Sequence, residues 1–240
     1  MKLRFLFFGI FFIVLSACTT EEKQAFREVE PTRNSREIII GTQVWMAKNL
    51  CVDYFRNGDP IPQVKSTKEW KKAAKNQQPA WCYYKNKLEN GAKYGKLYNW
   101  YAVNDPRGLA PEGWHIPTDN EWKLLSNYLG GEDFAGKKMK STSGWFDLDG
   151  NENGVGTNES GFNGLPGGFR DDFGSFGSQG SFGNWWSASE GSTGYACYRR
   201  CSTATITLAE ATALRREGFQ FVASGINLTL SGVQWSRRVI

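Results

Sequence analysis

The sequence predicts a single α+β domain, because helix-start signals, strand-like runs and a long region rich in glycine and aromatic residues follow one another in one chain. Two capping boxes mark helix starts: Ser66 with Glu69, and Thr118 with Glu121. In each, the hydroxyl and the glutamate satisfy two backbone N–H groups that have no partner inside the helix. Runs of β-branched and aromatic residues between turn residues predict strands. We find no internal repeat and no second boundary, and expect residues 36–240 to form the domain.

The first half of the domain is expected to alternate short strands and short helices. Residues 37–47 predict two strands that are joined at Gly41 and Thr42. The elements expected next are a short helix around 70–75, a strand over 80–84, a polar turn over 85–93 and, over 94–103, a helix or a buried strand, of which the helix is favoured.

Residues 114–131 carry the clearest helix signal. Pro117 favours an extended conformation at Ile116, so a short strand is expected to lead into the helix. After the capping box at Thr118, apolar residues recur at helical spacing and form one face: Trp122, Leu125, Tyr128 and Leu129. Gly130 and Gly131 are expected to end the helix, because glycine readily adopts the left-handed conformation of a helix C-cap.

Residues 161–186 differ from the rest of the chain in having eight glycines and seven aromatic residues. A disordered linker would not carry so many aromatic side chains. We therefore expect a long, ordered, irregular loop region packed by its own rings, and long loops inside a compact domain are usually functional. Strand-like runs follow it, over 204–208, 219–223, 226–230 and 233–239.

The N-terminus predicts export. Lys2 and Arg4 precede an apolar run over 5–15 that is too short to span a bilayer and is typical of a secretory signal peptide over residues 1–17. The run ends in Leu-Ser-Ala-Cys, which resembles the bacterial lipobox, so Cys18 is expected to carry acyl chains such as palmitate and to anchor the chain in a lipid bilayer. An ordinary signal peptide with an incidental cysteine is the alternative. Residues 18–35 are polar and predict a flexible tether.

Composition narrows the function. The net charge of +5 falls to +3 when Lys2 and Arg4 are removed, and no basic cluster suggests nucleic acid as a partner. The chain has one histidine and no Cys-x-x-Cys pair, which argues against zinc. A disulfide between Cys51 and Cys82 is conceivable, whereas Cys197 and Cys201 on one strand would be too far apart to bridge and are expected to be free.

Six sequence blocks, in order, resemble the Fibrobacter succinogenes major paralogous domain (FISUMP) family. They are IGTQVWMAKNL (40–50), YGKLYNW (94–100), PEGWHIPTD (111–119), KSTSGW (140–145), GFNGLPGGFR (161–170) and WWSASE (185–190). The resemblance implies a C-type lectin-like fold, similar to that of formylglycine-generating, sulfatase-modifying enzymes, with a small twisted antiparallel sheet, two or three helices and long loops. It implies a secreted or lipid-anchored protein of the bacterial surface and no particular activity.

The chain departs from this family at its end. Family members usually finish on a Gly-x-Ser-Val-Arg-Cys-Val-like strand, whereas Ala223 stands here in the place of the cysteine. Residues 225–240 extend beyond the usual family end. The related oxidases bind copper through a cysteine pair, and no matching pair occurs in the C-terminal part of this chain. Catalysis is therefore the least favoured function.

One stretch resembles part of a calcium-binding loop. Residues 149–154 read Asp-x-Asn-x-Asn-Gly, the order of the first half of an EF-hand loop, with glycine where the loop turns. The candidate ligands are Asp147, Asp149, Asn151, Asn153 and Glu159. The glutamate falls one position short of the place that the motif requires, and an ordinary Asp/Asn turn is the alternative. No other cofactor is expected.

A second candidate site lies in the glycine–aromatic region. Asp171 and Asp172 could bind hydroxyl groups, and Trp185 and Trp186 could stack on a sugar ring. The alternative is that these rings pack the loop onto the domain. His115 has no nucleophile motif beside it and is expected to be packed or hydrogen-bonded rather than catalytic.

Taken together, these features predict a lipid-anchored outer-membrane protein that faces the cell surface or the periplasm. Acidic residues just after Cys18, Glu21 and Glu22, resemble the export signal of some surface lipoproteins. The expected role is binding or adhesion, with a carbohydrate or a surface protein as ligand. The alternatives are a structural subunit of a fimbria-like surface assembly that has no small ligand and, more remotely, an enzyme related to formylglycine-generating oxidases.

Overall fold

The computed structural model of the protein describes residues 37–219 and 224–225. The predicted signal peptide, Cys18, the tether over 18–35, Ala223 and the strand-like runs at 226–230 and 233–239 lie outside these residues, as does the run at 219–223 after Phe219. In the described part of the chain, no helix combines the length and the apolar character that crossing a membrane requires.

The described chain alternates short helices with short strands. The helices are α1 (Thr67–Lys75), the 3₁₀ helix η1 (Tyr84–Asn86), α2 (Leu88–Tyr94), α3 (Trp100–Val103), α4 (Asp119–Tyr128) and α5 (Glu132–Met139). The strands are β1 (Glu37–Ile40), β2 (Gln43–Met46), β3 (Trp81–Cys82), β4 (Leu97–Asn99), β5 (Trp114–His115), β6 (Gly167–Arg170), β7 (Phe176–Gln179), β8 (Phe182–Glu190), β9 (Tyr195–Ser202), β10 (Ala209–Leu214), β11 (Gly218–Phe219) and β12 (Ser224–Gly225).

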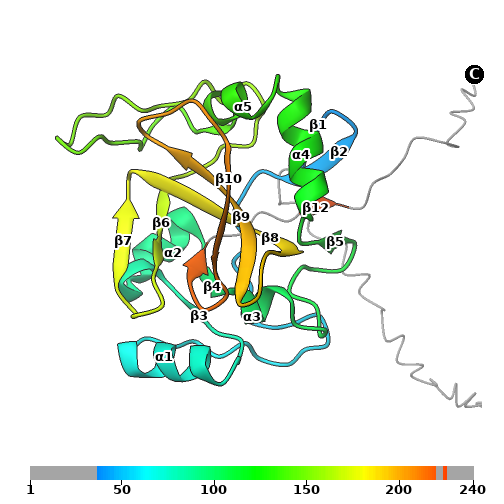
Figure 1. Ribbon diagram of the computed structural model, residues 1–240, viewed down its shortest axis with the longest axis vertical. Helices are drawn as coiled ribbons and strands as arrows, with labels where there is room; N and C mark the ends of the chain where they lie inside the picture. The colour runs from blue at the N-terminus through cyan, green and yellow to red at the C-terminus, as the bar shows by residue number, and fades with distance from the viewer. Residues whose placement is uncertain (1–36, 220–223, 226–240) are drawn as a thin grey trace, which may run out of the picture. The chain divides into compact units, whose positions relative to one another are not determined.

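The described strands form three antiparallel sheets, with the orders β1-β2-β12-β5, β10-β9-β8 and β3-β4-β11-β6-β7. The long strands β8 and β9 run through the middle of the view in Figure 1, with α4 and α5 above them and α1 below. β11 lies between β4 and β6, so a strand from near the end of the described chain joins its first and second halves. Helices and antiparallel sheets in one chain confirm the α+β class.

Several local predictions are confirmed. β1 and β2 form a hairpin that turns at Gly41, whose φ of 64° suits glycine. The Ser66 hydroxyl accepts from the Glu69 N–H and opens α1, and Thr118 does the same with Glu121 at the start of α4. The short strand β5 leads into α4, as the sequence indicates.

The prediction over 85–103 is wrong in part. The polar stretch 85–93 contains α2 rather than a turn, although Lys87 provides no side-chain cap. Residues 94–103 do not form one helix: β4 is followed directly by α3, whose first turn is capped because Asn99 Oδ1 accepts from the Ala102 N–H. A strand that pairs with β3 and β11 thus prevails over the helical pattern.

Two further expectations need correction. Residues 161–186 are not an irregular loop throughout, because they contain β6, β7 and the first part of β8. The strand expected over 204–208 begins instead at Ala209, and α5 follows α4 after two glycines without any sequence signal having indicated it. Backbone pairing with neighbouring strands, which spacing in the sequence does not reveal, decides these boundaries.

The core is built largely from tryptophans. The fully buried members are Trp45, Trp70, Trp122, Trp145, Trp185 and Trp186. The ring centroids of Trp45 and Trp122 are 4.9 Å apart, which places the inner face of α4 against the β1–β2 hairpin. Tyr128, expected on the same face, is 67% exposed instead. Its ring covers the hairpin turn, where a Cβ on Gly41 would lie 3.0 Å from it.

Candidate binding groove

A tight turn joins β6 to β7 at residues 171–175, and we call it the 171–175 turn. The Asp171 N–H donates to the Ser175 carbonyl at 2.8 Å, and the Gly174 N–H donates to the Asp171 carbonyl at 3.1 Å. Asp171 Oδ1 accepts from the Ser175 N–H at 2.7 Å. Both ends of the turn are therefore fixed, and of its middle residues Phe173 is exposed, whereas the Asp172 side chain is mostly covered.

Two buried side chains anchor this turn from below. Trp70 Nε1 on α1 donates to the Asp171 carbonyl at 3.0 Å. Arg170 is 1% exposed, and its guanidinium lies between the rings of Trp70 and Phe176, at 4.7 and 4.8 Å from their centroids. Arg170 Nε donates to the Gly174 carbonyl, while its other two nitrogens donate to the carbonyls of residues 64 and 65. The turn is thus tied to the segment that leads into α1.

A groove of about 520 Å³ lies beside the turn, between α1, α3 and the turn that joins β10 to β11. We call it the Phe173 groove. The side chains in its lining that carry chemistry are Lys71, Lys75, Tyr101, Asp172, Phe173 and Arg216. Phe173 is 65% exposed, and Arg216 Nε lies 3.1 Å from Asp172 Oδ2. A volume of this size is typical of a small-ligand site.

Glu217 adds an unusual carboxyl group behind the groove. Burial, with the negative charge of Asp172 as the next cause, raises the pKa of Glu217 from 4.5 to about 7, although Arg200 opposes the shift. Glu217 precedes Gly218, where an added Cβ would come within 2.8 Å of the Trp70 ring. The strand β11 is thus packed closely on α1, and the Glu217 carboxyl is held near the 171–175 turn.

The structure separates the predicted ligand residues. Asp172 reaches the Phe173 groove, whereas the Asp171 carboxylate serves the turn itself. Trp185 and Trp186 are fully buried; their indole nitrogens donate to Asn49 Oδ1 and to the Tyr98 carbonyl. Their place in the core corrects the expectation that they stack on a ligand, because neither ring reaches the surface. Phe173, from the same stretch, is the exposed ring instead.

Three groove residues could not be found from the sequence as members of one site. Lys71, Tyr101 and Arg216 come from three elements that are far apart in the chain. Only the pairing of β11 between β4 and β6 brings them to the same place. The one feature of the sequence that could have indicated this site was the run of lysines on the short helix α1.

The predicted calcium loop, residues 147–153, is closed by its own hydrogen bonds; we call it the 147–153 turn. Asp147 Oδ1 accepts from the backbone N–H groups of Asp149 and Asn151, and Oδ2 accepts from the Asn153 side chain at 2.5 Å. These bonds lower the pKa of Asp147. Within residues 37–219 and 224–225, no group of three or more acidic, histidine or cysteine side chains is placed to hold a metal. Glu159 is exposed, and the calcium interpretation stays a prediction.

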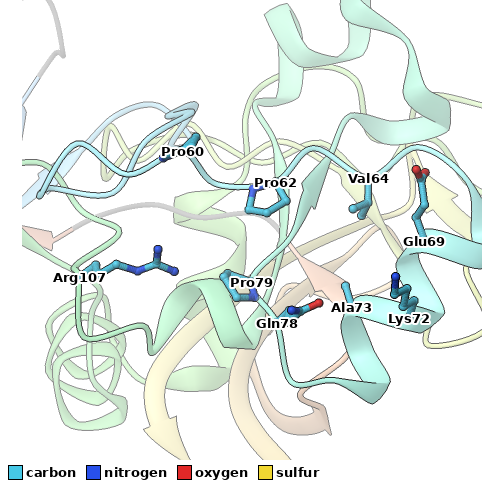
Figure 2. Close-up of a pocket in the computed structure, with 9 residues that line it drawn as sticks. All are labelled: Pro60, Pro62, Val64, Glu69, Lys72, Ala73, Gln78, Pro79 and Arg107. Atoms are coloured by element: carbon cyan, nitrogen blue, oxygen red, sulfur yellow. The ribbon is translucent and has the colours of Figure 1, made fainter.

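A second cavity, of about 360 Å³, is lined by Pro60, Pro62 and Pro79. Figure 2 shows Arg107 at one end of it and Glu69 with Lys72 at the other. Arg107 is already bound to Asp105 at 2.8 Å and to Asp59 at 3.0 Å, and Glu69 closes the capping box of α1. Proline rings cannot donate hydrogen bonds, and two of the three charged side chains in the lining, Arg107 and Glu69, are already bonded within the protein, which makes this cavity a weaker candidate than the Phe173 groove.

His115 and the cysteines show no arrangement of a nucleophile and a base in the described part of the chain. His115 Nε2 lies 2.6 Å from Glu121 Oε1, and this hydrogen bond raises the pKa of His115, which confirms a hydrogen-bonded histidine. All four cysteines in the described part of the chain are free, including Cys51 and Cys82. Burial raises the pKa of Cys82 to about 11 and that of Cys201 to about 12, so both are protonated thiols at neutral pH and poor nucleophiles.

Comparison with known proteins gives one family. The family model described as the Fibrobacter succinogenes major domain matches residues 38–218, which is more than half of the chain and includes both the 171–175 turn and Arg216. The description names a domain and no reaction. A search of curated proteins and a search of solved structures each found no match.

Proposed function

The chain belongs to the Fibrobacter succinogenes major domain family, and we propose that it is a lipid-anchored binding module of the bacterial cell envelope whose ligand lies in the Phe173 groove. The ligand is a carbohydrate or an exposed segment of a surface protein. The proposed fold is the C-type lectin-like fold, which is supported by the family, by the antiparallel sheets and by the long connections after α5.

The observation that carries this proposal is the rigid presentation of an exposed ring over a groove. Phe173 stands at the tip of a turn whose backbone is fixed by Trp70 and Arg170. An apolar side chain that is 65% exposed buries little area in the fold, yet the residues beneath it fix the backbone that carries it. Such preorganisation lowers the entropic cost of binding, because the contact surface is ordered before the ligand arrives.

A glycan array, probed with the folded domain, tests the proposal. We expect a restricted set of glycans to be bound, and Phe173→Ala to abolish that binding while the melting temperature is unchanged. Tyr128→Ala is the matched control, because Tyr128 is an equally exposed ring on α4, outside the groove. Equal loss of binding in both variants would contradict a site at Phe173.

The anchor is tested separately. We propose that Cys18 is acylated and that residues 18–35 tether the domain to the outer membrane. Cys18→Ser should release the protein from the membrane fraction, and protease treatment of whole cells should remove the domain if it faces outward. Persistence of the domain in shaved cells would place it on the periplasmic side.

A structural subunit of a surface assembly is the second candidate, and one observation favours it. β1 is an edge strand of its sheet, and Ile39 on it is 76% exposed. Edge strands offer unpaired backbone groups to which another chain can add a strand. Isolation of the protein in large oligomers, and their loss in Ile39→Lys, would support assembly; a monomer in both forms would argue against it.

A further inference from the structure

The Phe173 groove has a positively charged rim. Lys71 and Lys75 are four residues apart on α1 and therefore lie on the same face of that helix. Arg216 faces them from the turn between β10 and β11. In the lining, these three cations are opposed by one carboxylate, Asp172, which is already paired with Arg216 at 3.1 Å. The groove therefore has a surplus of positive charge.

The two lysines are available for a ligand. Among residues 37–219 and 224–225, neither Lys71 nor Lys75 forms an ion pair, whereas Lys87, Lys96 and Lys123 each do. The acidic residue in the first turn of α1, Glu69, is bonded to Ser66. Lys71 Nζ lies 5.7 Å from the centroid of the Phe173 ring, so a charged group and an apolar ring face are presented together.

This pairing of features fits a particular ligand chemistry. A sugar ring can place its C–H face on Phe173 or Tyr101, and an acidic substituent on the same ring can reach an ammonium group. Neutral sugars would use only the rings. A short acidic peptide would use the ammonium groups but has no rigid, flat apolar face to match Phe173.

We propose that the Phe173 groove binds acidic saccharides, with the ring stacked on Phe173 and its carboxylate or sulfate group bound by Lys71 and Lys75. This inference rests on the proposed binding function of the same groove and narrows its ligand class. Arg216 holds Asp172 in place and keeps that carboxylate from repelling the ligand.

Calorimetric titration of the intact domain with defined oligosaccharides tests this. The probes are tri-galacturonate, a sulfated galactose trimer, neutral galactotriose and tri-glutamate. We expect the two acidic sugars to bind at least about tenfold more tightly than the neutral one, and this preference to shrink as salt rises, because exposed charges are screened. The carboxylated and sulfated probes identify which acidic group the site prefers.

Two charge-matched variants locate the effect. Lys71→Gln with Lys75→Gln should weaken binding of the acidic sugar about tenfold, which corresponds to about 1.4 kcal/mol. Lys68→Gln with Lys72→Gln removes the same charge from the same helix but outside the groove, and should leave the affinity nearly unchanged. Circular dichroism of both variants shows whether α1 stays folded.

The outcomes separate the two levels of the proposal. Equal affinity for neutral and acidic sugars, lost in Phe173→Ala, would overturn the inference but leave the binding function standing. Binding of tri-glutamate as tight as that of tri-galacturonate would overturn the assignment to saccharides. No binding of any sugar here, together with silence on the glycan array, would overturn this inference and also the carbohydrate ligand of the proposed function, and would leave a surface-protein segment as its ligand.

Discussion

Two turns of this protein are closed by similar aspartate hydrogen bonds but differ in how many contacts they make with the rest of the domain. In the 147–153 turn and in the 171–175 turn, an aspartate carboxylate accepts backbone N–H groups two to four residues later. Leu148, at the tip of the first, is completely exposed, and the turn is closed mainly by its own side chains. The second is held by Trp70 and Arg170 from beneath.

The difference shows that a turn motif does not by itself make a binding site. Asx-type hydrogen bonds fix the backbone of either turn. Only the 171–175 turn is also tied to a neighbouring helix. The 147–153 turn borders a cavity of about 510 Å³, but the charged side chains in that lining belong to the turn itself, whereas the Phe173 groove has charged groups from other elements. Preorganisation of the 171–175 turn therefore comes from its tertiary contacts.

The largest effect is expected at Arg170. Arg170→Met keeps an apolar stem between Trp70 and Phe176 but removes the Arg170 donors from the carbonyls of Val64 and Gly174, and leaves the Lys65 carbonyl only its bond from Asn86 Nδ2. We expect the free energy of unfolding, measured by urea denaturation, to fall by about 3–5 kcal/mol. Lys65→Met, at an exposed position of the same segment, is the control and should change it little. A loss below about 1 kcal/mol for Arg170→Met would mean that the turn is not anchored there.

A smaller effect is expected at Trp70. Trp70→Phe retains an aromatic ring but removes the Nε1–H bond to the Asp171 carbonyl and leaves a small void, for a loss of about 2–3 kcal/mol. Amide hydrogen exchange should speed up within the 171–175 turn and stay unchanged in the 147–153 turn. Equal acceleration in both turns would indicate global destabilisation instead of local loosening.

The elements around these residues differ in how well the sequence predicts them. The capping boxes at Ser66 and Thr118 are local signals, so the starts of α1 and α4 could be predicted. β6 and β7 could not, because glycine-rich strands have no alternating pattern and form only through pairing with their neighbours. Asp172 could be proposed from the sequence, because carboxylates bind hydroxyl groups. Arg216 could not, because it lies beside Asp172 only when β11 pairs between β4 and β6.

The tryptophan pair explains why the predicted site was partly wrong. Trp185 and Trp186 are adjacent on β8, and both faces of that strand are covered, so both rings are buried. An exposed antiparallel strand would have shown one ring to solvent, since neighbouring side chains point to opposite faces. The sequence does not indicate which strands are covered on both faces.

The buried carboxyl group of Glu217, near the 171–175 turn, should make the free energy of unfolding depend on pH. Its pKa is raised from 4.5 to about 7, so between these values the folded state binds more protons than the unfolded state, and stability falls as pH rises. After allowance for solvent screening, the loss is about 1 kcal/mol and is complete above about pH 7. Glu217→Gln should match the wild type at pH 4 and be more stable at pH 8 in thermal melts. An unchanged difference across this range would show that the carboxyl is solvated.

The smallest effect is expected at the unsupported turn. Asp147→Ala removes the acceptor of four hydrogen bonds at an exposed tip, and should change Tm by less than about 2 °C. The lowered pKa of Asp147 gives this small contribution the opposite sign to that of Glu217, since it is present at neutral pH and lost in acid. Millimolar calcium should not raise Tm in the wild type, because the carboxylate oxygens already accept amide donors. A rise that disappears in Asp147→Ala would show instead that the turn opens to bind calcium, and that its weak tertiary support leaves it free to do so.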